Sequence, residues 1–453
     1  MTADAGADAG ADTSADTGTG AADEQLDGFF SAARVTARDE AIELAGTDFR
    51  RFLYDHDDET LAPWRGMGYQ EFSDARRDDR FLQALLDEWN AELDEPFAGV
   101  TSDGVVRPGL YDLAERGDDA ELVAAAEGAL ATLTDEQREA FRHPLDSKEW
   151  RAWSNPEFVF HRVGLRLEDL SEEQVAAMLG LVEASLSAEG YERVREAMQL
   201  NGFLGELVDL PTILNDRSYW VALYGDPVAG GAWGWQLFGH HVAVHFVTVA
   251  GRHVVAPVFL GAEPALSDGE RPPIFEAREE TALELAASLT DEQRAAAVVY
   301  ASVLDPKMPA GRLHPADERH VAGAFHDNRL IPYEGISAYD LDDEQWALLL
   351  DLVEDYLLLL RPDQRRLTRA DVEEHRDETW FAWYGGTDGT QPFYFRIQSP
   401  VIVAELDHHA GVWLNNRVPQ RFHVHSTLRL PNGNDYGRAY VEQWRARQGD
   451  TQA

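Results

Sequence analysis

Residues 220–225 read WVALYG, and residues 380–385 read WFAWYG. The similarity continues without a gap, so that HVAVHF at 241–246 aligns with VIVAEL at 401–406. Both regions are rich in aromatic and β-branched residues and carry glycines between the apolar runs, which is typical of antiparallel strands separated by turns. The chain therefore contains two copies of a strand-forming region.

A second set of copies precedes the strands. The hexapeptide LTDEQR occurs at 133–138 and again at 289–294. In each copy a Thr followed three residues later by Gln forms a capping box, which opens a helix. SEEQ at 171–174 and DDEQ at 342–345 open two further helices, whose apolar residues recur at the spacing of one buried helix face. Helices therefore precede strands in both copies.

These patterns predict an α+β fold with two internal repeats, each made of helices followed by an antiparallel β-meander. We expect a pseudo-twofold axis between the repeats, whose strands form either a shared sheet or two facing sheets, and an additional N-terminal helical region. The predicted boundaries are a disordered acidic tail at 1–24, the helical region at 25–130, repeat 1 at 131–275, repeat 2 at 276–445 and a flexible tail at 446–453.

The charge of the chain is unusual, with 82 Asp+Glu against 39 Lys+Arg among 453 residues and a formal net charge of -43. Such an excess destabilises a folded chain by self-repulsion unless salt screens it. The composition therefore indicates a halophilic protein with a solvated acidic surface, and a surface that binds cations or a basic partner is the alternative. No stripe of Lys and Arg is visible, which disfavours nucleic acid as a partner.

Other sequence features exclude whole classes of protein. The chain has no cysteine, so disulfides, thiolate metal sites and cysteine nucleophiles are excluded. No apolar run is long enough for a membrane span. Residues 1–24 are rich in Ala, Asp, Gly and Thr and lack the apolar region of a secretory signal, so we expect a cytoplasmic protein. The sequence leaves the oligomeric state open.

Several segments together resemble one known family. They are GWQLFGHHVAVHF at 234–246, IPYEGISAYDL at 331–341, TWFAWYGG at 379–386, LDHHAGVWL at 406–414 and FHVHSTLRLPNGNDYG at 422–437. In order and spacing they resemble the family catalogued as domain of unknown function 3500, over nearly the whole chain after the acidic tail. The family has no established activity, so the resemblance implies no catalytic residues.

Histidines concentrate in the two matched strand regions. Alternate residues of a strand share a face, so histidines or acids two or four positions apart are expected to project together. Imidazoles and carboxylates are ligands of divalent transition metals such as zinc. The predicted metal ligands are His241, His245, His408, His423 and His425, and the predicted catalytic carboxylates are Glu405 and Asp407.

Each carboxylate is expected either to complete the metal site or to act as general base on water. Aromatic residues and arginines around the same strands suggest a binding pocket, because a guanidinium clamps a carboxylate or phosphate. The predicted substrate-binding residues are Tyr384, Arg396 and Arg421. For the two arginines, an ion pair with a neighbouring acid is the alternative. Four other histidines are expected at the surface or behind the ligands, namely His253, His314, His320 and His326.

The sequence lacks the motifs of common metalloproteases, nucleotide hydrolases, serine hydrolases and dinucleotide-dependent dehydrogenases. We therefore predict a metal-dependent enzyme that acts on a small molecule, with its site between the two repeats. Hydrolysis is favoured over oxidation because activation of water needs no further cofactor. The alternatives are a non-catalytic protein that binds a small ligand, and a histidine cluster that is purely structural.

Overall fold

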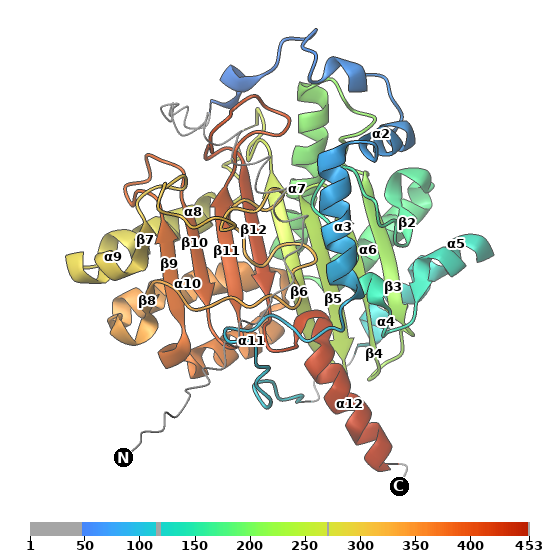
Figure 1. The fold of residues 1–453 in the computed structure, drawn as a ribbon. Coiled ribbons are helices and arrows are strands. Elements are labelled where there is room, and N and C mark those ends of the chain that lie inside the picture. The colour runs from blue at the N-terminus through green and yellow to red at the C-terminus, as the bar shows by residue number, and fades with distance from the viewer. Residues whose placement is uncertain (1–47, 115–118, 270, 452–453) are drawn as a thin grey trace, which may run out of the picture.

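The computed structural model describes residues 48–114, 119–269 and 271–451, so the acidic tail predicted at 1–24 lies outside the described residues. The described chain is a mixed α+β fold in which helices surround one large sheet (Figure 1). Its first elements are the 3₁₀ helices η1 (Phe49–Phe52) and η2 (Ala62–Trp64) and the helices α2 (Tyr69–Arg76) and α3 (Arg80–Asp94).

Within the described residues, the strands form a single 12-stranded sheet in the order β1-β3-β4-β5-β6-β12-β11-β10-β9-β7, with β2 and β8 attached to β3 and β9. The first-half strands are β1 (Arg142–His143), β2 (Leu165–Arg166), β3 (Tyr219–Gly225), β4 (Ala232–Gly239), β5 (Val242–Val249) and β6 (Arg252–Ala262). The second-half strands are β7 (Val298–Tyr300), β8 (Ile336–Ser337), β9 (Trp380–Tyr384), β10 (Tyr394–Gln398), β11 (Val403–His408) and β12 (Val424–Arg429).

Strands β3 to β6 and β9 to β12 are antiparallel meanders, and β6 pairs with β12 to join them. The sheet is therefore shared by the two halves, which was one of the two predicted arrangements. It is mixed, because β1 and β7 run parallel to β3 and β9. The pseudo-twofold axis stays a prediction.

The helices of both halves cover the back of the sheet as seen in Figure 1. They are α4 (Ala120–Ala131), α5 (Asp135–Phe141), α6 (Glu172–Ser185), α7 (Ala188–Leu207), α8 (Glu276–Ser288), α9 (Asp291–Ala297), α10 (Asp343–Tyr356) and α11 (Pro362–Glu374). Short 3₁₀ helices connect them, at η3 (Lys148–Arg151), η4 (Leu167–Asp169), η5 (Ala338–Asp340), η6 (Leu357–Leu359), η7 (Arg376–Glu378) and η8 (Asp435–Gly437).

The two predicted capping boxes are confirmed at the starts of α5 and α9, and the two further predicted helices, α6 and α10, also begin with capping boxes. Their glutamines also meet each other. The Gln174 side-chain amide donates to Gln137 Oε1 at 2.8 Å, and that of Gln293 donates to Gln345 Oε1 at 2.8 Å. The repeated DEQ and EEQ segments therefore join pairs of helix starts in each half.

Both faces of the central sheet are buried. On the helix side, Trp235 Nε1 of β4 donates to Ser185 Oγ of α6 at 2.9 Å. The front is covered by α3 and by the irregular segment 301–335, where Trp89 stacks on Phe325 with ring centroids 5.0 Å apart. The front face of the sheet is thus covered by α3 and segment 301–335, and the polar side chains of this face are buried beneath them.

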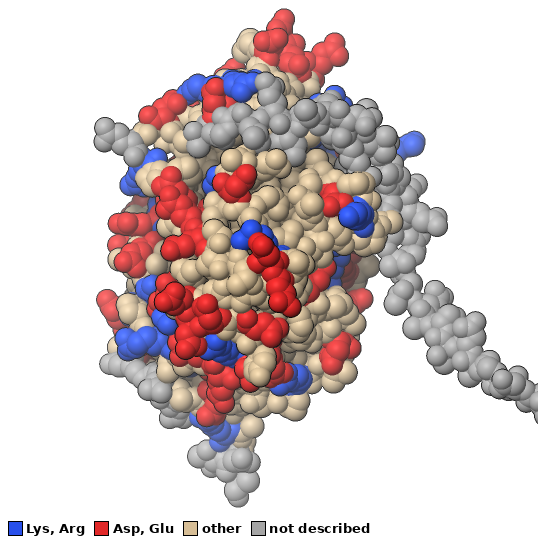
Figure 2. Space-filling model, turned by 90° about the vertical axis from the view of Figure 1, so that its left-hand side faces the viewer, with Lys and Arg blue, Asp and Glu red and all other residues tan. Residues whose placement is uncertain are grey.

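Among the charged side chains on the surface shown in Figure 2, acidic ones cover more area than basic ones. This agrees with the composition, whereas adaptation to salt and a cytoplasmic location stay predictions. Among the described residues, no helix has both the length and the apolar character needed to cross a bilayer. Helix α12 (Arg438–Thr451) extends into residues 446–453, the segment predicted as a flexible tail.

Candidate metal centre

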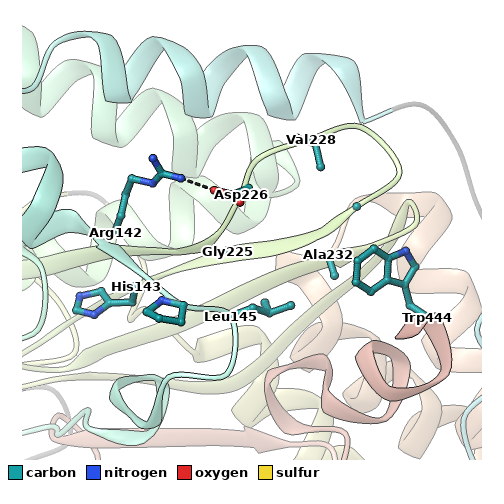
Figure 3. Close-up of a pocket in the computed structure, with 10 residues that line it drawn as sticks. Arg142, His143, Leu145, Gly225, Asp226, Val228, Ala232 and Trp444 are labelled. Carbon is teal, nitrogen blue, oxygen red and sulfur yellow. Dashed lines mark hydrogen bonds and ion pairs between the residues drawn. The ribbon is translucent and has the colours of Figure 1, made fainter. Parts of the chain in front are cut away.

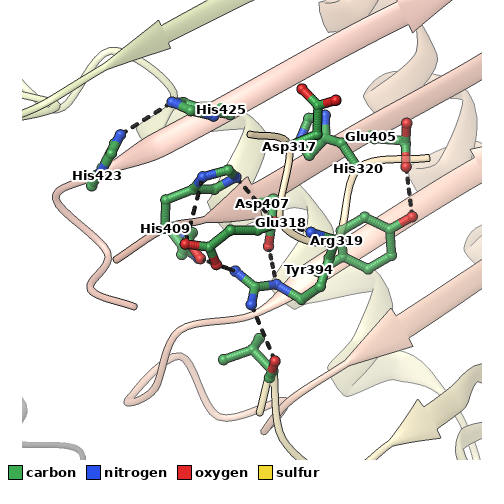
Figure 4. A network of polar contacts seen from close by, with 12 residues as sticks. Asp317, Glu318, Arg319, His320, Tyr394, Glu405, Asp407, His409, His423 and His425 are labelled. Carbon is green, nitrogen blue, oxygen red and sulfur yellow. Dashed lines mark hydrogen bonds and ion pairs between the residues drawn. The ribbon is translucent and has the colours of Figure 1, made fainter. Parts of the chain in front are cut away.

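Histidines from separate parts of the chain meet on the front of the sheet, and Figure 4 shows His320, His409, His423 and His425 near one another. His241 lies in the turn between β4 and β5. His409 directly follows β11, His423 directly precedes β12, and His425 lies on β12. His320 reaches the same place from segment 301–335, the covering segment, and contacts Thr427 of β12.

Three of these imidazoles form a group that could hold a metal ion. The ligand nitrogens of His241, His423 and His425 all lie within 4.8 Å of one another. The Nε2 atoms of His423 and His425 are 3.1 Å apart, close to the separation of about 3.3 Å expected for two nitrogens bound to one tetrahedral zinc ion. His423 Nδ1 donates to the Ala410 carbonyl at 2.7 Å, which leaves its Nε2 as the lone-pair nitrogen.

The local backbone makes this approach feasible. His241 has φ +63°, a left-handed conformation, and its backbone N–H donates to Asn155 Oδ1 at 3.1 Å. Gly261 of β6 lies beneath the rings, and a Cβ there would be 2.8 Å from His425 Cδ2 and 3.1 Å from His241 Cδ2. A glycine at position 261 therefore provides the space in which the two imidazoles meet.

The protonation state of this group favours metal binding. Burial lowers the pKa of His241, His423 and His425 well below the usual value, and the surrounding imidazoles lower it further. The rings are 1–4% exposed. They are consequently neutral at physiological pH, which is the form of histidine that binds metals.

A second group adjoins the first. The ligand atoms of His320, Asp407 and His409 also lie within 4.8 Å of one another. Arg319 Nε donates to Asp407 Oδ1 at 2.6 Å, and the Arg319 backbone N–H donates to Oδ2 at 3.1 Å. Burial opposes ionisation of Asp407, but Arg319 and His409 outweigh it and lower the pKa of the carboxyl. Asp407 is therefore a fixed anion beside the imidazoles.

Glu405, two residues before Asp407 on the same strand face, is fully buried and holds the covering segment. Its carboxylate accepts hydrogen bonds from the backbone N–H groups of Val321 and Ala322 at 2.9 and 3.0 Å. Tyr394 O–H donates to it at 2.7 Å. The catalytic roles predicted for Glu405 and Asp407 stay predictions, but the contacts of Glu405 anchor the segment that closes the centre.

Glu263, at the end of β6, is a further buried carboxylate beside the group. It accepts backbone hydrogen bonds from residues 412–414, and its Oε1 lies 3.8 Å from His423 Nδ1. Burial raises the pKa of Glu263 to about 7, although these backbone donors oppose the rise. The carboxylate therefore fixes the loop after β11 against the start of β12.

A third group, His314, Asp317 and His326, lies within the covering segment. It is engaged with α3, because His326 Nδ1 lies 3.0 Å from Glu92 Oε2 and His314 Nε2 lies 3.5 Å from Glu88. Burial opposes protonation of His314, but Asp317 and Glu88 outweigh it and raise the pKa to about 9. Carboxylates also raise the pKa of His326. This group is therefore a set of ion pairs.

Two predicted ligands lie apart from these groups. His241 belongs to a turn, so it does not share a strand face with His245, which lies on β5. His245 Nδ1 donates to the Pro257 carbonyl at 2.8 Å, and its ring packs against aromatic rings of Trp153 and Tyr436. Burial lowers its pKa to about 3. His408 projects from the opposite face to Asp407, where its Nε2 lies 3.3 Å from Glu279 of α8.

The predicted substrate-binding residues have protein partners. On the front face, Tyr384 O–H and Arg396 Nη2 both donate to Glu334 Oε2, at 2.7 and 2.9 Å. On the helix face, Arg421 Nε donates to Glu279 Oε2 at 3.0 Å. Each arginine thus has the acidic partner that was the alternative interpretation, and their role towards a substrate stays a prediction.

The histidines expected at the surface or behind the ligands are all buried, namely His253, His314, His320 and His326. Sequence reasoning placed neither His320 nor His409 among the ligands. No periodic pattern marks His320, because it lies in an irregular segment, whereas His409 follows the strand pattern of Glu405 and Asp407. The carboxyl of Glu263 was missed as well.

A surface pocket of about 530 Å³ lies elsewhere, between β3, β4 and α12 (Figure 3). Its lining includes Arg142, Val228 and Trp444, and none of the clustered histidines. The ion pair of Arg142 with Asp226 lies at its rim. The buried histidine groups and the surface pocket are therefore separate features.

Comparison with curated proteins and with solved structures gives no match. A family model does match, over residues 115–438, and its description is "Protein of unknown function (DUF3500)". The matched region contains α4 to α11, the whole sheet and all three histidine groups. It covers well over half of the chain, in agreement with the resemblance noted from the sequence segments, and the chain therefore belongs to this family of unknown function.

Proposed function

We propose that the protein binds a divalent transition metal ion through His241, His423 and His425 and uses it in the hydrolysis of a small molecule. The observation that carries the proposal is the convergence of three neutral, buried imidazoles whose ligand atoms lie within 4.8 Å of one another. Three histidines with a remaining open position are a common ligand set of catalytic zinc.

The Nε2 atoms of His423 and His425 support this assignment. They face each other at 3.1 Å, and His423 already uses Nδ1 as a donor, so the proton between them belongs to His425 Nε2. A metal ion here would be held by the lone pairs of both Nε2 atoms, with the proton of His425 on its Nδ1 instead. Such an ion lowers the pKa of coordinated water and acts as a Lewis acid.

Around the ion, the protein's own residues orient the ligands and supply charge. The Ala410 carbonyl fixes the tautomer of His423, Glu263 lies behind the same ring, and Asp407 is a nearby ionised carboxylate. In this proposal Asp407 is the candidate general base. Glu405 acts indirectly, because it holds residues 321 and 322 over the centre.

A structural metal centre is the second candidate function, favoured by the burial of all three rings. Structural zinc sites are closed by protein ligands, whereas catalytic sites keep an open position. The two functions therefore differ in whether an added small ligand reaches the metal.

The test uses tag-free protein purified at high salt, stripped with a chelator and loaded with Co²⁺. If the proposed function is correct, azide changes the visible absorption of the bound Co²⁺ by entering the open position. Bound Co²⁺ that does not respond to azide establishes the structural alternative instead. Failure to bind Co²⁺ and Zn²⁺, with the fold intact by circular dichroism, overturns both.

We also infer that the repeats are related by a local twofold axis between β6 and β12. The pairing Val221–Leu237 of β3 and β4 recurs 160 positions later as Phe381–Ile397 of β9 and β10. The strand order is likewise the same from either edge towards the centre. The two halves differ at one matched position, because position 245 on β5 carries His where position 405 on β11 carries Glu.

A further inference from the structure

The group His320, Asp407 and His409 is drawn from two segments far apart in the sequence, yet all three side chains are buried at 0–3% exposure. His320 comes from the covering segment, Asp407 lies on β11, and His409 directly follows that strand. Figure 4 shows them beside His423 and His425. An imidazole–carboxylate–imidazole set of this kind is a ligand set for zinc, manganese or iron.

Two imidazole nitrogens of this group make no hydrogen bond to a described part of the chain. Among the described residues, His320 Nε2 and His409 Nε2 are buried atoms without a hydrogen-bond partner. His320 Nδ1 is engaged with Thr427 Oγ1 at 2.5 Å, which leaves Nε2 facing inwards. His409 Nε2 lies 3.1 Å from Asp407 Oδ2, but outside hydrogen-bond geometry. Buried polar atoms normally have partners, so His320 Nε2 indicates a missing one, whereas His409 Nε2 has the Asp407 carboxylate beside it.

The Asp407 carboxylate is held in an orientation that suits a cation. Arg319 Nε occupies Asp407 Oδ1 at 2.6 Å, whereas Oδ2 takes only a backbone donor and turns towards His409. The carboxylate cannot rotate away without breaking both contacts. Additional negative charge lies close by, since Glu318 Oε1 is 3.8 Å from His409 Nδ1. A second cation would therefore enter a site with an oriented oxygen and compensating charge.

The two groups are in direct contact. The ring centroids of His409 and His425 are 3.8 Å apart, and those of His409 and His423 are 5.5 Å apart. In two-metal hydrolytic sites the ions lie about 3.5–4 Å apart. Rings from adjacent groups at van der Waals contact are compatible with ions at such a separation.

We propose that His320, Asp407 and His409 bind a second transition metal ion next to the one at His241, His423 and His425, so that the centre is dinuclear. The inference rests on the proposed function for the first ion and extends it, and it makes Asp407 a ligand of the second ion in place of the general base. In a dinuclear centre two ions share the task of holding the attacking and departing oxygens of a hydrolysed ester or amide. His320 is contributed by segment 301–335, so this segment forms part of the proposed centre.

The test counts ions. Tag-free protein stripped with a chelator is loaded with Zn²⁺, desalted and analysed by plasma mass spectrometry. We expect about two equivalents in the wild type and about one in His409→Ala. His408→Ala is the matched control, because the neighbouring side chain lies on the opposite face of β11, and about two equivalents are expected there as well.

The outcomes separate the two proposals. One equivalent in the wild type overturns the second site and leaves the proposed function standing, whereas none overturns both. Two equivalents that persist in His409→Ala place the second ion elsewhere and overturn this assignment. If His409→Ala fails to fold, electron paramagnetic resonance of the wild type loaded with Mn²⁺ decides, because a coupled pair of ions gives a spectrum that two isolated ions do not.

Discussion

Two groups of buried histidines on the front of the sheet have opposite chemistry. His241, His423 and His425 face one another, and His423 donates to a backbone carbonyl. The pKa values of all three are lowered. His314 and His326 face Asp317, Glu88 and Glu92 at comparable burial, and their pKa values are raised.

The difference shows that burial alone does not decide what a histidine does. Desolvation disfavours the imidazolium in both groups, and only neighbouring carboxylates reverse that effect. The group formed by His241, His423 and His425 is therefore suited to a metal cation. His314 and His326, by contrast, already have carboxylate partners in Asp317 and in Glu88 and Glu92 of α3. In the group of His314, Asp317 and His326 the histidines are the cations, and they tie α3 to segment 301–335.

The largest expected difference between the groups is in metal affinity. We expect His425→Ala to weaken Zn²⁺ binding on the order of 100-fold or more, because changes behind metal ligands alone cost 10–100-fold. His326→Ala is the matched variant in the ion-paired group, and its affinity should stay within about 3-fold of the wild type. Competition with a chromophoric chelator measures both. Equal weakening by the two variants would show that the groups do not differ as described.

The groups also predict opposite effects of pH on the stability of the metal-free protein. The lowered pKa values mean that, as pH falls from about 6.5 to 5, the unfolded chain takes up protons that the folded chain does not, so stability decreases. The raised pKa of His314 stabilises the fold fully below about pH 6.5, and this contribution is lost as pH rises towards 9.

For His314 the loss is on the order of 2–3 kcal/mol across that alkaline range. Urea denaturation between pH 5 and 9.5 measures the profile. His314→Gln should flatten the alkaline limb and leave the acid limb in place. An acid limb that disappears in this variant would contradict the assignment of the two limbs to separate groups.

Two glycines allow a gentler comparison. A Cβ at Gly261 would be 2.8 Å from the His425 ring, whereas a Cβ at Gly323 would be 2.5 Å from the Asp317 carboxylate. Gly261→Ala should therefore displace metal ligands and weaken Zn²⁺ binding about 10-fold. Gly323→Ala should lower thermal stability without a change in affinity. Weaker Zn²⁺ binding in Gly323→Ala, with unchanged binding in Gly261→Ala, would show that the metal binds at the group around Asp317 instead.

Much of the fold follows from local sequence patterns. The capping boxes at Thr134, Ser171, Thr290 and Asp342 fix helix starts within the chain itself, and the period-two aromatic runs fix the strands. Whether the two meanders share one sheet depends on the pairing of β6 with β12, a long-range contact that no local pattern specifies.

The residues of the candidate site could be predicted from the sequence only where they lie on or directly beside a strand. His423, His425 and Asp407 follow from alternation on β11 and β12 and the repeat. His241 was expected on a strand, but it reaches the centre from a turn with positive φ. His320 approaches from an irregular segment held by Glu405 and Arg319, so only tertiary structure reveals it.

The smallest expected effect concerns salt. Raising KCl from about 0.2 to 2 M should stabilise the wild type, because the net charge of -43 is then screened. The difference in unfolding free energy between wild type and His326→Ala should change by less than about 0.5 kcal/mol, since buried charges are screened little. A difference that vanishes at high salt would mean that solvent reaches the ion-paired group.

The most direct test of the central claim is X-ray absorption spectroscopy of the Zn²⁺-loaded, tag-free protein, because it reports the atoms bound to the metal. The account predicts imidazole nitrogens at about 2.0–2.1 Å with the multiple-scattering pattern of histidine rings. A shell made of oxygen alone, or protein that retains no Zn²⁺ after desalting, would contradict it.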